Sequence, residues 1–227
     1  MDAEEFAELT HVKIEEVLAA SPVMPVVTIR ELGQAAELAR ALVAGGIRVI
    51  EVTLRTPVAL EAISAMVKAV PEAIVGAGTV CTRTELDAAR DAGAVFAVSP
   101  GATPELLDDG AAHALPFLPG VATASEIMAG LLRGYSHFKF FPAGIAGGTS
   151  ALAAFAGPFP AVRFCPTGGI TAALASNYLA LPNVLCVGGS WLVPDGAVRA
   201  NDWTTIEGLA HQAATSLRRH GAEFATR

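Results

Sequence analysis

The sequence predicts an α/β fold, a (β/α)8 TIM barrel with one additional N-terminal helix that covers the bottom of the barrel. Short apolar runs alternate with alanine-rich stretches of helical character, and this pair repeats eight times along the 227 residues. Strict alternation implies parallel strands joined by crossover helices, and eight such units can close into a barrel. An open, doubly wound sheet is the alternative, but its GxGxxG phosphate motif does not follow the first apolar run.

The predicted strands are the eight apolar runs. They are Val23–Ile29, Ile47–Leu54, Ala73–Ala77, Val95–Val98, Leu115–Leu118, His137–Phe141, Val162–Cys165 and Val184–Val187. The predicted helices follow the strands, one by one. They are Gly33–Ala44, Val58–Val70, Thr82–Ala92, Thr103–Ala112, Thr123–Arg133, Gly148–Phe155, Thr171–Ala180 and Trp203–His220.

The boundaries of these helices have local signals. Thr82 and Thr123 each precede a glutamate by three residues, which is typical of a helix start. Gly46, Gly93 and Gly134 stand where helices should end.

The chain is expected to form a single domain over residues 1–227, because no linker or composition shift divides it. Its parts would be an N-terminal helix within 1–21, core strands and helices within 22–200, and a C-terminal helix within 201–227. Apolar residues make up 52% of the chain, which is ample for one core.

Charge and composition exclude several classes of protein. The net charge of −7 argues against nucleic-acid binding, which usually needs a basic patch. The acidic N-terminal segment is unlike a signal peptide, and no apolar run reaches the ~18 residues of a membrane span.

Cys81, Cys165 and Cys186 have no CxxC spacing, which indicates reduced thiols in a cytoplasmic protein, with the latter two as core residues. The histidines show no metal-ligand spacing, so no metal is expected. A reactive lysine that serves as the electron sink would also need no cofactor.

One lysine stands in an unusual place. The chain has three lysines against twelve arginines, and Lys139 lies in the apolar stretch SHFKFFPAG. Because side chains alternate along a strand, Lys139 and Glu51 are both predicted to point into the barrel, from strands that oppose each other. They could be a purely structural ion pair. Buried pairs stabilise little, however, and barrel interiors are normally filled by branched apolar side chains, so a functional pair is favoured.

The chemistry follows from the residue types. Apolar surroundings disfavour the charged form of an amine, and a neutral amine can attack a ketone to form a Schiff base. Glu51 would then move protons. Arg55, on the same face of its strand, can clamp a carboxylate in bidentate fashion, and Thr79 can add a hydroxyl donor.

A second anion site is predicted at the last two strand ends. PTGGI contributes Gly168 and Gly169, and VGGSW contributes Gly188, Gly189 and Ser190. The loops after strands seven and eight commonly bind phosphate in this architecture, through backbone N–H groups and a helix N-terminus.

Six separated motifs resemble one family. VIEVTLRTP, IVGAGTV, AVSPG, FKFFPA, RFCPTGGI and CVGGSWLVP, in order between residues 21 and 194, are similar to bacterial class I 2-keto-3-deoxy-6-phosphogluconate (KDPG) aldolase, also called 2-keto-4-hydroxyglutarate (KHG) aldolase. The resemblance implies that Lys139 forms the Schiff base and Glu51 is the general acid/base. The implied pyruvyl and carboxylate contacts are Arg55, Thr79, Pro100, Pro119 and Phe141. The implied contacts at the phosphate end are Thr167, Gly168, Gly169, Gly189 and Ser190.

The resemblance also implies a homotrimer, a cytoplasmic location and a role in the Entner–Doudoroff pathway. The partners would be a keto acid and a phosphorylated aldehyde, with no nucleic acid and no membrane. The loop AGIAGG departs from the family, which would have an acidic residue near Gly144–Ile145. Alternatives are the same chemistry on 4-hydroxy-2-oxoglutarate or another 2-keto-3-deoxy sugar acid, a non-covalent phosphate-binding isomerase, and a small-molecule binding protein.

Overall fold

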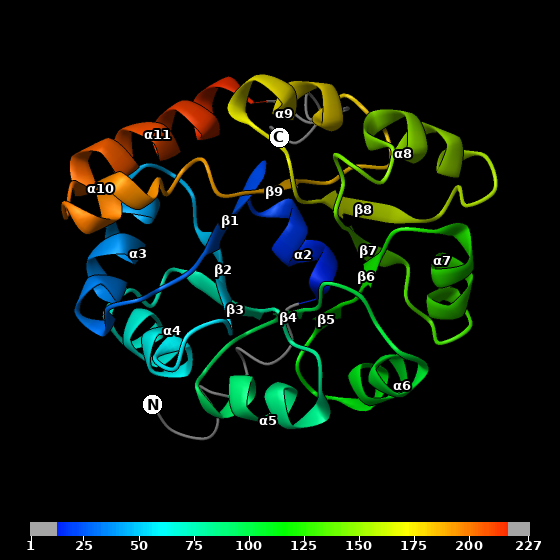
Figure 1. The fold of residues 1–227 in the computed structure, drawn as a ribbon, viewed down its shortest axis with the longest axis horizontal. Helices are drawn as coiled ribbons and strands as arrows, with labels where there is room; N and C mark the ends of the chain where they lie inside the picture. The colour runs from blue at the N-terminus through cyan, green and yellow to red at the C-terminus, as the bar shows by residue number, and fades with distance from the viewer. Residues whose placement is uncertain (1–12, 218–227) are drawn as a thin grey trace, which may run out of the picture.

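The parallel strands lie inside a ring of helices (Figure 1) in the computed structural model, which describes residues 13–217. The strands are β1 Val23–Val27, β2 Val49–Thr53, β3 Ile74–Gly78, β4 Ala97–Val98, β5 Phe117–Leu118, β6 Gly120–Val121, β7 His137–Phe140, β8 Arg163–Pro166 and β9 Val187–Gly189. The α-helices are α2 Ile14–Ala19, α3 Ala35–Ala44, α4 Ala59–Ala69, α5 Arg83–Asp91, α6 Pro104–Ala112, α7 Ala124–Leu131, α8 Gly148–Ala156, α9 Ala172–Leu179, α10 Asp195–Arg199 and α11 Trp203–Ser216. A short 3-10 helix, η1 Leu32–Gln34, leads into α3.

The predicted closed, eight-stranded barrel is wrong. The strands form two parallel sheets, a six-stranded sheet in the order β5-β4-β3-β2-β1-β9 and a three-stranded sheet in the order β6-β7-β8. Between β5 and β6 stands Pro119, which has no N–H for a ladder hydrogen bond. At the other junction, β8 meets the segment around β9 only through the isolated bridges Phe164↔Val184 and Thr167↔Gly188. Pro166 lies between these two bridges and also lacks a donor.

The predicted helix boundaries are largely confirmed. Thr82 and Thr123 both form capping boxes, in which the threonine and a glutamate three residues later bond each other's backbone. Gly46, Gly93 and Gly134 have φ values of 90°, 89° and 85°, the left-handed conformation that ends a helix.

The N-terminal helix packs on the inner apolar cluster. The prediction placed this helix within residues 1–21; residues 1–12 lie outside the described part of the chain, and α2 occupies Ile14–Ala19. Val17 and Leu18 of α2 are 1% and 0% exposed. They contact a cluster of inward-facing side chains from the strands. That cluster comprises Met24, Val49, Phe96, Val98, Leu118, Cys165 and Cys186.

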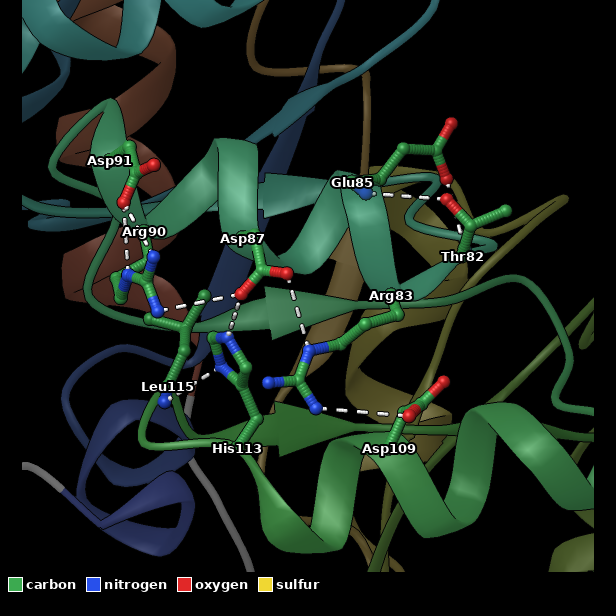
Figure 2. A network of polar contacts seen from close by, with 9 residues as sticks. All are labelled: Thr82, Arg83, Glu85, Asp87, Arg90, Asp91, Asp109, His113 and Leu115. Carbon is green, nitrogen blue, oxygen red and sulfur yellow. Dashed lines mark hydrogen bonds and ion pairs between the residues drawn. The ribbon is translucent and has the colours of Figure 1, made fainter.

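A polar network links α5, α6 and the turn before β5 (Figure 2). His113 Nδ1 accepts the Leu115 N–H at 3.0 Å, so its proton is on Nε2, which lies 3.1 Å from Asp87 Oδ1. This hydrogen bond lowers the pKa of Asp87. Arg83 extends the network from Asp87 to Asp109. The network therefore joins the neighbouring helices α5 and α6.

No helix among residues 13–217 combines the length and apolar character that crossing a bilayer requires.

Candidate active site

Lys139 of β7 and Glu51 of β2 meet between the two sheets. Lys139 Nζ lies 3.0 Å from Glu51 Oε1 and 3.3 Å from Oε2, so the amine can donate to both carboxylate oxygens. The side chains are 6% and 1% exposed. The ring of Phe141 covers the amine, with its centroid 5.5 Å from Nζ. The predicted meeting of these two side chains is confirmed, while their catalytic roles remain predictions.

Strand alternation produces this meeting. On β2, Ile50 and Val52 belong to the outer core beneath the helices, and Glu51 points the opposite way. On β7, Phe138 and Phe140 belong to the same outer core, which leaves Lys139 facing inward. The apolar residues therefore fix the direction in which each charged side chain points.

A glycine makes room for the carboxylate. Gly78, at the end of β3, pairs in register with Thr53 of β2. A Cβ at Gly78 would lie 2.2 Å from Glu51 Oε1 and 2.6 Å from its Cγ, closer than atoms can approach. Sequence reasoning missed this residue. The signal was the glycine of GAGTV, immediately before the predicted Thr79.

The structure brings Arg55 and Thr79 together. Arg55 Nε donates to Thr79 Oγ1 at 3.1 Å, which joins the ends of β2 and β3. Thr79 has a φ of 63°, an outlier for a β-branched residue. Such strain persists only where surrounding structure imposes it, and it concentrates at functional sites.

The predicted wall residues lie around β6 and the end of β7, with Pro119 directly before β6 and Phe141 directly after β7. The Pro119 carbonyl accepts the Lys139 N–H at 2.9 Å, and Gly120 pairs in register with Lys139. A Cβ at Gly120 would lie 2.4 Å from the Pro100 carbonyl carbon, so Pro100 packs directly on that backbone. Ser99, which sequence reasoning missed, is fully buried and its Oγ accepts the Gly120 N–H at 3.1 Å.

The two glycine-containing loops lie beside the end of β7. Thr167 donates its N–H to the Phe140 carbonyl at 2.9 Å, and Gly144 donates to the Gly168 carbonyl at 2.9 Å. Thr167 also bridges to Gly188, where a Cβ would lie 2.1 Å from the threonine Oγ1.

Other members of the predicted set complete these loops. Gly168 and Gly169 have φ values of 99° and 76°, which glycine adopts without strain. Gly189 is buried at the end of β9, and Ser190 next to it is exposed. Anion binding by these loops remains a prediction.

A buried amine beside a carboxylate, with an arginine and hydroxyls at the neighbouring strand ends, can form a Schiff base with a keto acid and move the necessary protons. This arrangement defines a class I aldolase, a carbon–carbon lyase.

Comparison with known proteins identifies the particular family. Residues 14–209 match the family described as KDPG and KHG aldolase. The chain therefore belongs to the KDPG and KHG aldolase family.

Curated relatives and solved structures agree. The KHG/KDPG aldolase of Escherichia coli (strain K12) is 53% identical over 204 residues, covering 90% of this chain and 96% of that protein. The 2-dehydro-3-deoxy-phosphogluconate aldolase of Pseudoalteromonas atlantica is 52% identical over 202 residues, covering 89% and 94%. The crystal structure of KDPG aldolase from Legionella pneumophila, with pyruvate captured as a covalent carbinolamine intermediate, superposes with a TM-score of 0.88. It is 51% identical and covers 90% of this chain and 99% of that one.

Proposed function

We propose that this chain cleaves KDPG to pyruvate and D-glyceraldehyde 3-phosphate through a Schiff base on Lys139. The observation that carries the proposal is the buried contact of 3.0 Å between Lys139 Nζ and Glu51 Oε1. The names of the relatives, and the pyruvate carbinolamine in the Legionella protein, support it.

The reaction begins when a proton moves from Nζ to the Glu51 carboxylate and leaves the amine neutral. Nζ attacks the C2 ketone, and loss of water from the carbinolamine gives the iminium. Glu51, now ionised again, takes the proton of the C4 hydroxyl, directly or through a water. The C3–C4 bond breaks, and its electrons pass into the iminium to give an enamine. After the aldehyde leaves, Glu51 returns the proton to C3, and hydrolysis releases pyruvate.

The surrounding residues bind the two ends of the substrate. Arg55 would hold the carboxylate in bidentate fashion, and Thr79 both orients the guanidinium and adds a donor. Pro100, Pro119 and Phe141 would enclose the pyruvyl group. The loops Thr167–Gly169 and Gly188–Ser190 would receive the phosphate through their backbone N–H groups.

A second substrate is also proposed. The E. coli relative carries the double name KHG/KDPG aldolase, so we infer that this chain also cleaves 4-hydroxy-2-oxoglutarate to pyruvate and glyoxylate. The same family membership supports a cytoplasmic homotrimer that performs the cleavage step of the Entner–Doudoroff pathway.

Covalent trapping tests the proposal. Incubation with pyruvate and borohydride should add one reduced pyruvyl group at Lys139 and abolish turnover, as intact mass and peptide mapping would show. Lys13 and Lys68 are exposed and serve as internal controls that should stay unmodified. A Lys68→Met variant should trap normally, and a Lys139→Met variant should not trap at all. An unmodified Lys139 together with full activity would rule out the Schiff base.

A further inference from the structure

Two thiols are in contact within the inner apolar cluster. Cys165 lies in β8 and Cys186 directly precedes β9, and their sulfur atoms are 3.4 Å apart, with Cys186 donating to Cys165. The residues are 2% and 1% exposed. The two segments that carry them are neighbours, joined by the bridges Phe164↔Val184 and Thr167↔Gly188 on either side of the two cysteines. A bond of ~2.05 Å could therefore form with a modest movement of the two side chains.

The pair adjoins the proposed catalytic residues. Cys165 pairs in register with Lys139 on the neighbouring strand. Its sulfur lies 3.9 Å from the hydroxyl of Thr167, in the loop that continues to the exposed Gly169. On the other side, α2 covers the cluster that contains both sulfur atoms. Cys165 is thus the thiol in contact with the loop at the carboxyl ends of the strands.

We propose that Cys165 and Cys186 form a reversible disulfide when the protein meets hydrogen peroxide. The Cys165 sulfur attacks one peroxide oxygen, the O–O bond breaks, and the thiol proton passes to the departing hydroxide, which gives a sulfenic acid and one water. The Cys186 thiol then attacks that sulfur; the S–O bond breaks, the disulfide forms and a second water leaves. The two sulfur atoms lose two electrons in total, and the peroxide is reduced to two waters.

The disulfide would act on the site through the strands that carry it. Cys165 is two residues before Thr167, and Cys186 is two residues before Gly188, so the proposed phosphate loops follow the two cysteines directly. Drawing the sulfur atoms together would move these loops and β8, the strand that pairs with β7 at Lys139. A displacement of about 1 Å in an active site can reduce the rate about 100-fold, and we expect a reversible loss of that order.

The experiment starts from a Cys81→Ser variant, because Cys81 is exposed and would otherwise react and cross-link chains. This variant keeps the two inner thiols as the remaining cysteines of the chain. After treatment with hydrogen peroxide and removal of the excess, its intact mass should fall by about 2 Da as two hydrogens are lost. Peptide mapping should join the Cys165 and Cys186 peptides, and a thiol reductant should restore both mass and turnover.

The matched control is Cys81→Ser with Cys186→Ala, since alanine replaces a buried thiol by a small apolar group. In this variant peroxide should add oxygen to Cys165 instead of removing hydrogen, and no linked peptide should form. Failure of the first variant to lose 2 Da, or a disulfide that leaves turnover unchanged, would overturn the proposal. The mass measurement needs no substrate, so its result does not depend on the proposed aldolase activity.

Discussion

Replacing Gly78 by alanine should disable catalysis while leaving the fold intact. Gly78 lies in β3 outside the left-handed region of φ, so alanine meets no backbone strain there. The added Cβ would lie 2.2 Å from Glu51 Oε1 and must reach 3.4 Å for ordinary contact, a shift of about 1.2 Å. Glu51 is 1% exposed and its carboxylate is held by Lys139. It therefore has no open space in which to relax.

The magnitude follows from this displacement. Misplacing a catalytic group by about 1 Å typically costs about 100-fold in rate, which is about 2.7 kcal/mol in transition-state stabilisation. Overpacking a buried position costs about 1–3 kcal/mol in the free energy of unfolding. Gly78→Ala should therefore lose about 100-fold in kcat/KM for KDPG cleavage and unfold at a somewhat lower urea concentration.

A Gly76→Ala variant separates the loss of rate from the loss of folding stability. Gly76 is on the same strand, two residues earlier, and a Cβ there would lie 2.4 Å from Phe96 in the inner apolar cluster. It should destabilise the protein by a similar amount and yet leave Glu51 in place. Pyruvate release and urea unfolding would be measured on both variants. If Gly78→Ala stays within about threefold of Gly76→Ala in kcat/KM, the carboxylate position does not govern the reaction.

Three other results are expected. Glu51→Gln keeps the side-chain shape but removes proton transfer, so kcat should fall about 10²–10⁴-fold while the protein stays folded; a loss below about threefold would leave Glu51 as a structural counter-ion. Ser190→Ala should reduce kcat/KM for KDPG about 10–150-fold, equivalent to a hydrogen bond to a charged group of about 1.5–3 kcal/mol, and 4-hydroxy-2-oxoglutarate much less; equal losses would remove Ser190 from the phosphate site. Burial lowers the pKa of His137, so between neutral and mildly acidic pH the unfolded chain binds the proton more readily and stability falls as pH falls. Urea unfolding at pH 7.5 and about 5.5 should show a smaller pH effect in His137→Gln, and an unchanged effect would assign it to other groups.

The contact between Lys139 and Glu51 could be predicted because it depends on a local rule. Alternation along a strand needs only the sequence of that strand, and the apolar partners of Lys139 and Glu51 identify the outward face. A second local pattern, a threonine three residues before a glutamate, located both helix-capping threonines. Such features require no knowledge of distant contacts.

Sheet closure could not be predicted in this way. Eight alternating units are compatible with a continuous ladder, but whether adjacent strands pair along their length depends on individual donors. Pro119 interrupts one junction and Pro166 another, so the hydrogen bonds divide into two sheets. Gly78 and Ser99 were missed for a related reason. Their importance lies in contacts with residues of other strands, Glu51 and Gly120 respectively.

Several features that reduce stability gather at one end of the strands. Glycine inside a strand costs roughly 0.5–1 kcal/mol relative to alanine, and a residue held in a sparsely populated conformation, as Thr79 is, costs of order 1–3 kcal/mol. The buried pair of Lys139 and Glu51 contributes little in return, because desolvation offsets its attraction. Natural sequences break local rules mainly where function requires it. Gly78 and Lys139 both lie against the Glu51 carboxylate, and the strained Thr79 directly follows Gly78, so the energetics of the fold point to the candidate site independently of any relative.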